Sequence, residues 1–225
     1  MTKLSTDARV SVTHSVAEQL HLSFTNSDLA DDANLTNIFG NLEIKMTAMT
    51  EAIKHSKAES DLAEKDEARD FVIRGIASSL QSAQFSFDAS VQTAYVTLNR
   101  IFEKYGVIMA GESYAIESSL IKAFLQDVST TEAEAAIAVI PFLSDLIARL
   151  ASAQTDFDNA ENVWNAAKST DTVSSTALKK ELFDIINNQV VAYLTALSAI
   201  NTDYKSLASQ VEEIIETANR NIKRK

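Results

Sequence analysis

The chain has three histidines, and two of them lie close together near its start. His14, Glu18 and His21 follow one another at spacings of four and three residues, which places them on one face of a helix. Glu-x-x-His motifs supply ligands to di-iron sites in helical bundles, and such a site needs two of these motifs. Glu51 and His55 are four residues apart and do not complete the pattern. We therefore predict that the candidates His14, Glu18 and His21 are surface residues, and we expect neither a metal nor another cofactor.

No motif for a nucleophile or a phosphate loop stands in the sequence, and cysteine is absent. The absence of cysteine excludes disulfides, thiolate catalysis and thiolate metal sites. The densest charged run, residues 64–70, is interpreted as an acidic helix start beside positive dipole charge, with an acidic patch for docking a partner as the alternative. Trp164, Tyr193 and Tyr204 lie at seam spacing, which is typical of core residues rather than of a ligand site. No residue is assigned a catalytic role, and we predict that the protein is not an enzyme.

Composition points to long helices. The 225 residues are 46% hydrophobic and include only 4 Gly and 1 Pro, so few turns are available. The formal net charge of −11 argues against a nucleic-acid partner and gives no attraction to anionic lipid. Residues 1–15 have no apolar core typical of a signal peptide, and no stretch is apolar enough to span a bilayer. We expect a cytoplasmic location and no membrane partner.

Apolar residues recur at alternating spacings of four and three, which is typical of helices that pack along a seam. One seam predicts a helix from Thr131 to Lys168, with a capping box formed by Thr131 and Glu134. A second seam predicts a helix from about Ser174 to near the end of the chain, after a break at residues 169–175. The first of these seams consists of Val139, Leu143, Leu146, Leu150, Ala153, Phe157, Ala160, Trp164 and Ala167.

The first half of the chain has weaker seams, which predict two helices joined by a turn at residues 56–61. Shorter amphipathic segments at residues 7–24 and 112–127 precede the long helices of each half. Gly106 is placed to end a helix, and Gly75 lies within a helical pattern, where it allows either a close helix contact or a bend.

These patterns predict an all-α fold, an elongated helical bundle of about six helices. The order short, long, long occurs twice, in residues 1–108 and in residues 109–225, and a shift of about 104 residues aligns the seams. We interpret this repetition as an internal duplication. The two halves form either one bundle or two.

Three short segments resemble a family of bacterial all-helical proteins of about this size, catalogued as a domain of unknown function. They are Lys54–His55–Ser56–Lys57, the motif Asp66-x-x-Arg69–Asp70, and the segment from Tyr105–Gly106 to Tyr114. The resemblance implies a helical fold, and it implies no activity, cofactor or catalytic residue.

Seams that are almost purely apolar leave no evident pocket, so our first hypothesis is a non-enzymatic scaffold or protein-interaction protein. Its partner would be another protein or a second copy of the chain. One alternative is a membrane-active helical protein of the pore-forming type, since long helical hairpins suit that role. A metal-dependent helical-bundle enzyme is the other alternative, and it would depend on the histidine candidates above.

Overall fold

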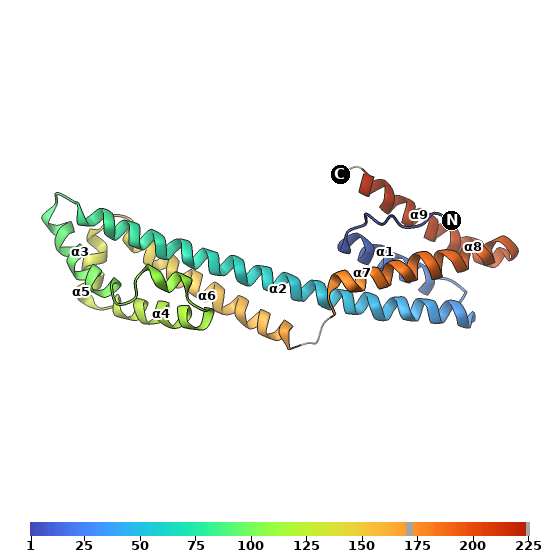
Figure 1. The fold of residues 1–225 in the computed structure, drawn as a ribbon, viewed down its shortest axis with the longest axis horizontal. Coiled ribbons are helices and arrows are strands. Elements are labelled where there is room, and N and C mark those ends of the chain that lie inside the picture. Colours follow the sequence, from blue (N-terminus) through green and yellow to red (C-terminus); the bar gives the residue numbers. More distant parts are fainter. Residues whose placement is uncertain (170–172, 224–225) are drawn as a thin grey trace. The chain divides into compact units, whose positions relative to one another are not determined.

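The computed structural model describes residues 1–169 and 173–223, and every regular element within these ranges is helical (Figure 1). The predicted all-α fold is therefore confirmed. Among the described residues α7 (Ser175–Asp184), the π-helical turn η2 (Ile185–Val190) and α8 (Val191–Ile200) follow one another without a break. The nine α-helical segments of these ranges thus make eight separate helices rather than about six. None of the described helices is both long enough and apolar enough to cross a membrane.

The chain divides into two compact units. Unit 1 comprises residues 1–56 and 169–225, and unit 2 comprises residues 57–168. The units are therefore not the consecutive halves 1–108 and 109–225 that the sequence suggested. The first boundary between the units falls within the helix α2 (Ala33–Gln84), and the chain re-enters unit 1 after residue 168. The internal duplication stays a prediction.

Unit 1 contains α1 (Val10–Thr25), the first part of α2 (Ala33–Gln84), the α7–η2–α8 helix, and α9 (Lys205–Lys223). Helix α1 packs against both α7 and α9. Phe24 stacks on Phe39 with ring centroids 4.3 Å apart. Apolar side chains of the core with no exposed surface include Leu20, Leu35, Phe39, Leu42, Met49, Ile186, Leu194, Val211 and Ile215.

Asp32 fixes the start of α2 in unit 1. Its carboxylate accepts hydrogen bonds from the backbone N–H groups of Asn34 and Leu35, as a helix N-cap does. The hydroxyls of Tyr193 and Tyr204 also donate to it, at 2.9 and 2.7 Å. The hydrogen bond to Asp32, together with burial, raises the pKa of Tyr204 to about 12, so the phenol remains a donor at neutral pH. Both tyrosines thus pack beside the core, as expected, while their hydroxyls join distant parts of the chain.

An extended segment at the start of unit 1 is held by side-chain amides. Asn187, in the π turn η2, accepts from the backbone N–H of Leu4 at 2.8 Å and donates to the carbonyl of Leu4 at 3.1 Å. Asn219 makes the equivalent pair with Ser5 N–H and the Lys3 carbonyl, at 2.8 and 2.9 Å. Leu4 is buried and lies in no helix, so its backbone N–H and carbonyl need other hydrogen-bond partners. The side-chain amide of Asn187 supplies both.

Unit 2 contains the rest of α2 together with α3 (Ala89–Phe102), the 3₁₀ turn η1 (Val107–Gly111), α4 (Tyr114–Asp127), α5 (Thr131–Val139) and α6 (Leu143–Lys168). Helix α3 packs on α5, and α4 packs on α6. A Cβ atom added at Gly75 would lie 3.2 Å from Cδ2 of Leu146 in α6, so this glycine permits a close helix contact. Gly106 has φ 66° and donates its N–H to the carbonyl of Phe102, the last residue of α3. Its left-handed conformation is the one expected of a helix-ending glycine, but the cap of α3 is Glu103, so Gly106 is not the residue directly after the cap.

The turn predicted at residues 56–61 is wrong, because α2 continues through it for 52 residues in all. The segment has no Gly or Pro, and Ala58 and Leu62 are buried, so apolar packing continues across it. The helix predicted from Thr131 to Lys168 is interrupted. Pro141 disfavours helical geometry in the residue before it, and Ile140 has ψ 122°. The side chain that caps α5 is Thr130, one residue before the predicted cap.

The last predicted helix is also interrupted, after Ile200. Asn201 takes an extended conformation, and its side chain accepts from the N–H of Asp203 to start the 3₁₀ turn η3 (Thr202–Tyr204). The spacing of apolar residues continues through this break, so the seam gave no sign of it. In the break predicted at residues 169–175, residues 170–172 lie outside the described part of the chain.

We predict that Asn187→Leu lowers the free energy of unfolding by roughly 2–5 kcal/mol, because it leaves a buried N–H and a buried carbonyl of Leu4 without partners. Urea denaturation followed by circular dichroism measures this change. The matched control is Asn188→Leu at the next residue. The side-chain amide of Asn188 is exposed, and its oxygen accepts a hydrogen bond from Nζ of Lys3. We expect the control to lose less than about 1 kcal/mol. Equal losses in the two variants would contradict the role given to Asn187.

Candidate functional site

The structure places the three predicted metal candidates on α1 in unit 1. His14 is mostly buried rather than on the surface. Its Nε2 lies 2.8 Å from the hydroxyl of Thr50 on α2. Its Nδ1 lies 3.5 Å from the carboxylate of Glu18, which is exposed. His21 is half-buried, and its Nδ1 has no hydrogen-bond partner among the described residues. Within these residues no group of three or more His, Asp or Glu side chains is arranged to hold a metal ion.

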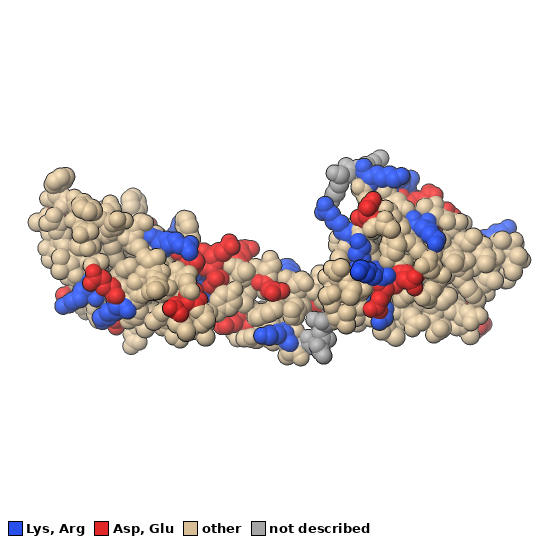
Figure 2. All heavy atoms as spheres, in the orientation of Figure 1, with Lys and Arg blue, Asp and Glu red and all other residues tan. Residues whose placement is uncertain are grey.

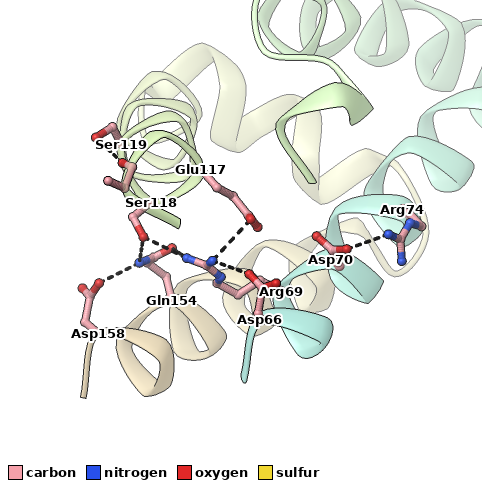
Figure 3. A network of polar contacts seen from close by, with 10 residues as sticks. Asp66, Arg69, Asp70, Arg74, Glu117, Ser118, Ser119, Gln154 and Asp158 are labelled. Atoms are coloured by element: carbon pink, nitrogen blue, oxygen red, sulfur yellow. Dashed lines mark hydrogen bonds and ion pairs between the residues drawn. The ribbon is translucent and has the colours of Figure 1, made fainter. Parts of the chain in front are cut away.

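A fully buried arginine is the centre of unit 2. Arg69 extends from α2 toward α4 and α6 and has no exposed surface (Figure 3). One terminal nitrogen donates to Asp66 at 2.7 Å and lies 3.3 Å from the carboxylate of Glu117 on α4. The other donates to the hydroxyl of Ser118 at 2.9 Å and to the amide oxygen of Gln154 on α6 at 3.1 Å. The arginine cluster, defined as these five residues, therefore ties three helices together.

A chain of polar contacts leads from this cluster to the surface. The amide nitrogen of Gln154 donates to Asp158 at 2.7 Å and to Ser118 at 3.2 Å. Lys122 on α4 lies 2.9 Å from the other oxygen of Asp158. The amide of Gln154 is thus fixed in orientation, since its nitrogen and oxygen each have partners of the right kind.

Aromatic rings close the remaining side of the guanidinium. The guanidinium carbon of Arg69 lies 3.4 Å from the centre of the Phe157 ring, a cation–π contact. Tyr114 packs edge-on against the same ring, with centroids 5.2 Å apart. The cation is therefore surrounded by two carboxylates, two neutral oxygens and one ring face.

Glu117 has an unusual protonation equilibrium in this environment. Its pKa is raised from 4.5 to about 7, mainly by burial. Arg69 opposes this increase, and the neighbouring charges of Asp66 and Asp70 contribute to it. One of its oxygens, Oε1, has no hydrogen-bond partner among the described residues. A carboxyl with this pKa changes its charge near neutral pH while it is buried beside a cation.

Sequence reasoning missed most of the cluster. The charged run at residues 64–70 was interpreted as a helix start, but it lies in the middle of α2, where no terminal dipole charge is present. The available signal was the seam itself. Counting back from Ile73 in steps of four and three reaches Arg69, Asp66 and then the buried Leu62. Glu117, Ser118 and Gln154 gave no comparable signal, because polar residues on a helix usually lie outside the core.

The arginine cluster is suited to holding helices together rather than to binding a substrate. No surface of the Arg69 side chain is exposed, so a ligand would have to displace one of its present partners. Arginine is permanently charged and donates its hydrogen bonds, so it offers no proton for acid–base chemistry. Glu117 could exchange a proton, but it faces Arg69 and not an open cavity.

An exposed aromatic surface lies elsewhere in unit 2. Phe85 and Phe87, in the link between α2 and α3, and Phe142, in the link between α5 and α6, are all largely exposed. We call these three residues the phenylalanine patch. Beside them is a groove of about 560 Å³, here called the serine groove, which is lined by residues from both links and from α2. Its lining includes Ser78, Ser79, Ser82, Ala83, Ser86, Val91, Ile140, Pro141, Phe142 and Leu146.

The protein is thus all-α, and its buried arginine cluster joins three helices of the same chain. The chain belongs to a family of unknown function (DUF6261), whose model matches residues 59–214. This match confirms the resemblance found in the sequence and includes the arginine cluster, the phenylalanine patch and the serine groove. No curated protein and no solved structure matches the chain.

We predict that Arg69→Met lowers the free energy of unfolding by about 3–5 kcal/mol, because it leaves the buried Glu117 and the partly buried Asp66 without their cation. Chemical denaturation at pH 7 measures the loss. Arg74→Met is the matched control, since Arg74 is an exposed arginine on the same helix that pairs with Asp70. A control loss of more than about 1 kcal/mol, or a small loss at Arg69, would be inconsistent with the central position of Arg69.

The raised pKa of Glu117 predicts a pH dependence of stability. The folded-state pKa of about 7 exceeds the ordinary value of 4.5, so the contribution of this group is complete below pH 4.5 and is lost as the pH rises to 7. Relative to Glu117→Gln, the wild-type chain should lose about 3 kcal/mol across this interval. Urea denaturation at several pH values measures the difference in unfolding free energy between the wild type and Glu117→Gln. The pH dependence of the other titratable groups cancels in this difference. The exposed Glu112→Gln should follow the wild type, and a parallel profile for Glu117→Gln would refute the prediction.

Proposed function

We propose that this protein is a non-enzymatic helical scaffold that binds another protein chain through the phenylalanine patch of unit 2. The observation that carries the proposal is the exposure of three phenylalanines in two links that both contribute residues to one groove. Single exposed apolar residues are ordinary, but grouped aromatic side chains on a soluble surface are typical of protein-binding sites. Aromatic residues supply much of the binding energy at such interfaces.

The surroundings of the patch support this proposal. Residues 75–99 contain one charged residue, Asp88, and residues 135–144 contain none. Figure 2 shows the corresponding area at its upper left as a surface without charged side chains. A surface with few charges is easier to desolvate, so a partner would bury it at a small electrostatic cost. The arginine cluster supports the same function, because it makes α2, α4 and α6 a firm base for the patch.

Co-isolation from the native host tests this function. We expect tagged wild-type chain to recover a protein in a fixed molar ratio, and we expect a chain with Phe85→Ser and Phe142→Gly to lose it. Phe71→Ser is the matched control, since Phe71 is an equally exposed phenylalanine that lies within α2 and outside both links of the phenylalanine patch. Mass spectrometry of the recovered proteins is the measurement. The same recovered proteins in the patch variant and the wild type would overturn the proposal.

A further inference from the structure

The serine groove is lined by residues from both of the links that carry the phenylalanine patch. Phe142 belongs to both the patch and the groove, and Ser86 of the groove stands between Phe85 and Phe87 in the sequence. The segments that carry exposed rings therefore border a hollow in which five of the ten lining residues are serine or alanine. We propose, building on the function proposed above, that the partner at this surface is a second copy of the same chain, bound with twofold symmetry.

Twofold symmetry requires a surface that is complementary to itself. In such an interface, residue i of one copy contacts residue j of the other, and the reverse contact follows. A surface that has both a projection and a hollow meets this requirement, because each copy can place its rings in the groove of the other. The groove volume of about 560 Å³ is formed by α2, the link after it and the link between α5 and α6.

Phe142 combines a strained backbone with an exposed side chain. Its φ is 64°, in the left-handed region, and it is the one described residue other than glycine with positive φ. This conformation is unfavourable for a bulky residue. The ring is 79% exposed, so packing within the chain does not offset that cost. Burial of the ring against a second copy would offset it.

Charge favours a second copy at this place. Two chains that each carry a net charge of −11 repel one another over most of their surfaces. The patch and the groove avoid this repulsion because Asp88 is the one charged residue in residues 75–99. Its carboxylate is already engaged at the start of α3, where it accepts from the N–H of Ser90 at 2.8 Å. The same shortage of charge, with no Lys or Arg at residues 75–99, gives no attraction to an anionic membrane.

The area available agrees with a weak dimer. A phenylalanine side chain buries about 150–250 Å², so three rings contribute roughly 450–750 Å² per copy. Two copies together would bury roughly 900–1,500 Å², near the lower limit of stable interfaces at about 1,200 Å². We therefore expect a reversible dimer whose fraction depends on concentration.

Sedimentation equilibrium of the purified full chain, from about 1 to 100 μM, tests this inference. The wild type should show a monomer–dimer equilibrium. Phe87→Ser combined with Phe142→Gly should raise the dissociation constant at least about tenfold, and Phe71→Ser should leave it unchanged. Glycine accepts positive φ without strain, so thermal unfolding of the double variant should remain close to that of the wild type.

A second variant tests the groove without removing any ring. Ser82→Glu places a charge on an exposed position of α2 that lines the groove, and glutamate is the better helix former. In a twofold dimer the two new charges would face the same interface, so association should weaken at least about tenfold. This result keeps the inference testable even if the double variant does not fold.

Two results would overturn the inference: a monomeric wild type at 100 μM, or a dimer that persists in both the groove and the patch variants. A monomeric wild type whose co-isolated partner is still lost in the patch variant would leave the proposed function intact. In that case the partner is a different protein.

Discussion

The buried charge of Arg69 is the interaction on which unit 2 depends. A guanidinium removed from water is stable only where carboxylates and neutral oxygens replace its hydration. Asp66, Glu117, Ser118 and Gln154 meet this need at the two terminal nitrogens, and Phe157 covers one face of the guanidinium. Nε of Arg69 has no hydrogen-bond partner among the described residues. The distances in this cluster therefore constrain how α2, α4 and α6 can pack. An apolar seam would permit small slips that this arrangement does not.

Unit 1 uses polar contacts in a different way. Asn187 and Asn219 hold extended backbone, and Asp32 receives the hydroxyls of Tyr193 and Tyr204. Each contact joins segments far apart in the sequence and leaves the apolar core intact. The π turn that carries Asn187 belongs to this system, since π turns within helices often mark positions with a special role. Both units thus combine apolar seams with a few polar contacts that fix the packing.

The phenylalanine patch contains features that are unfavourable for the stability of the isolated chain. Phe142 keeps a conformation that suits glycine, and its ring and that of Phe87 remain exposed. Phe87 lies in the link after α2, outside the core. A surface of this kind is unfavourable in water, which is why we connect it with binding rather than with folding.

The sequence alone determined the all-α class, because scarce Gly and Pro together with apolar residues at spacings of four and three leave few alternatives to long helices. It also indicated the family of unknown function to which the chain belongs. Tertiary structure decided where helices continue and where they stop: α2 runs through residues 56–61, while Asn201 ends α8. It alone decided that Arg69 is buried. The physical reason is that a polar residue at a seam position is stable only if partners on other helices meet it, and those partners lie about 50 and 85 residues further along the chain.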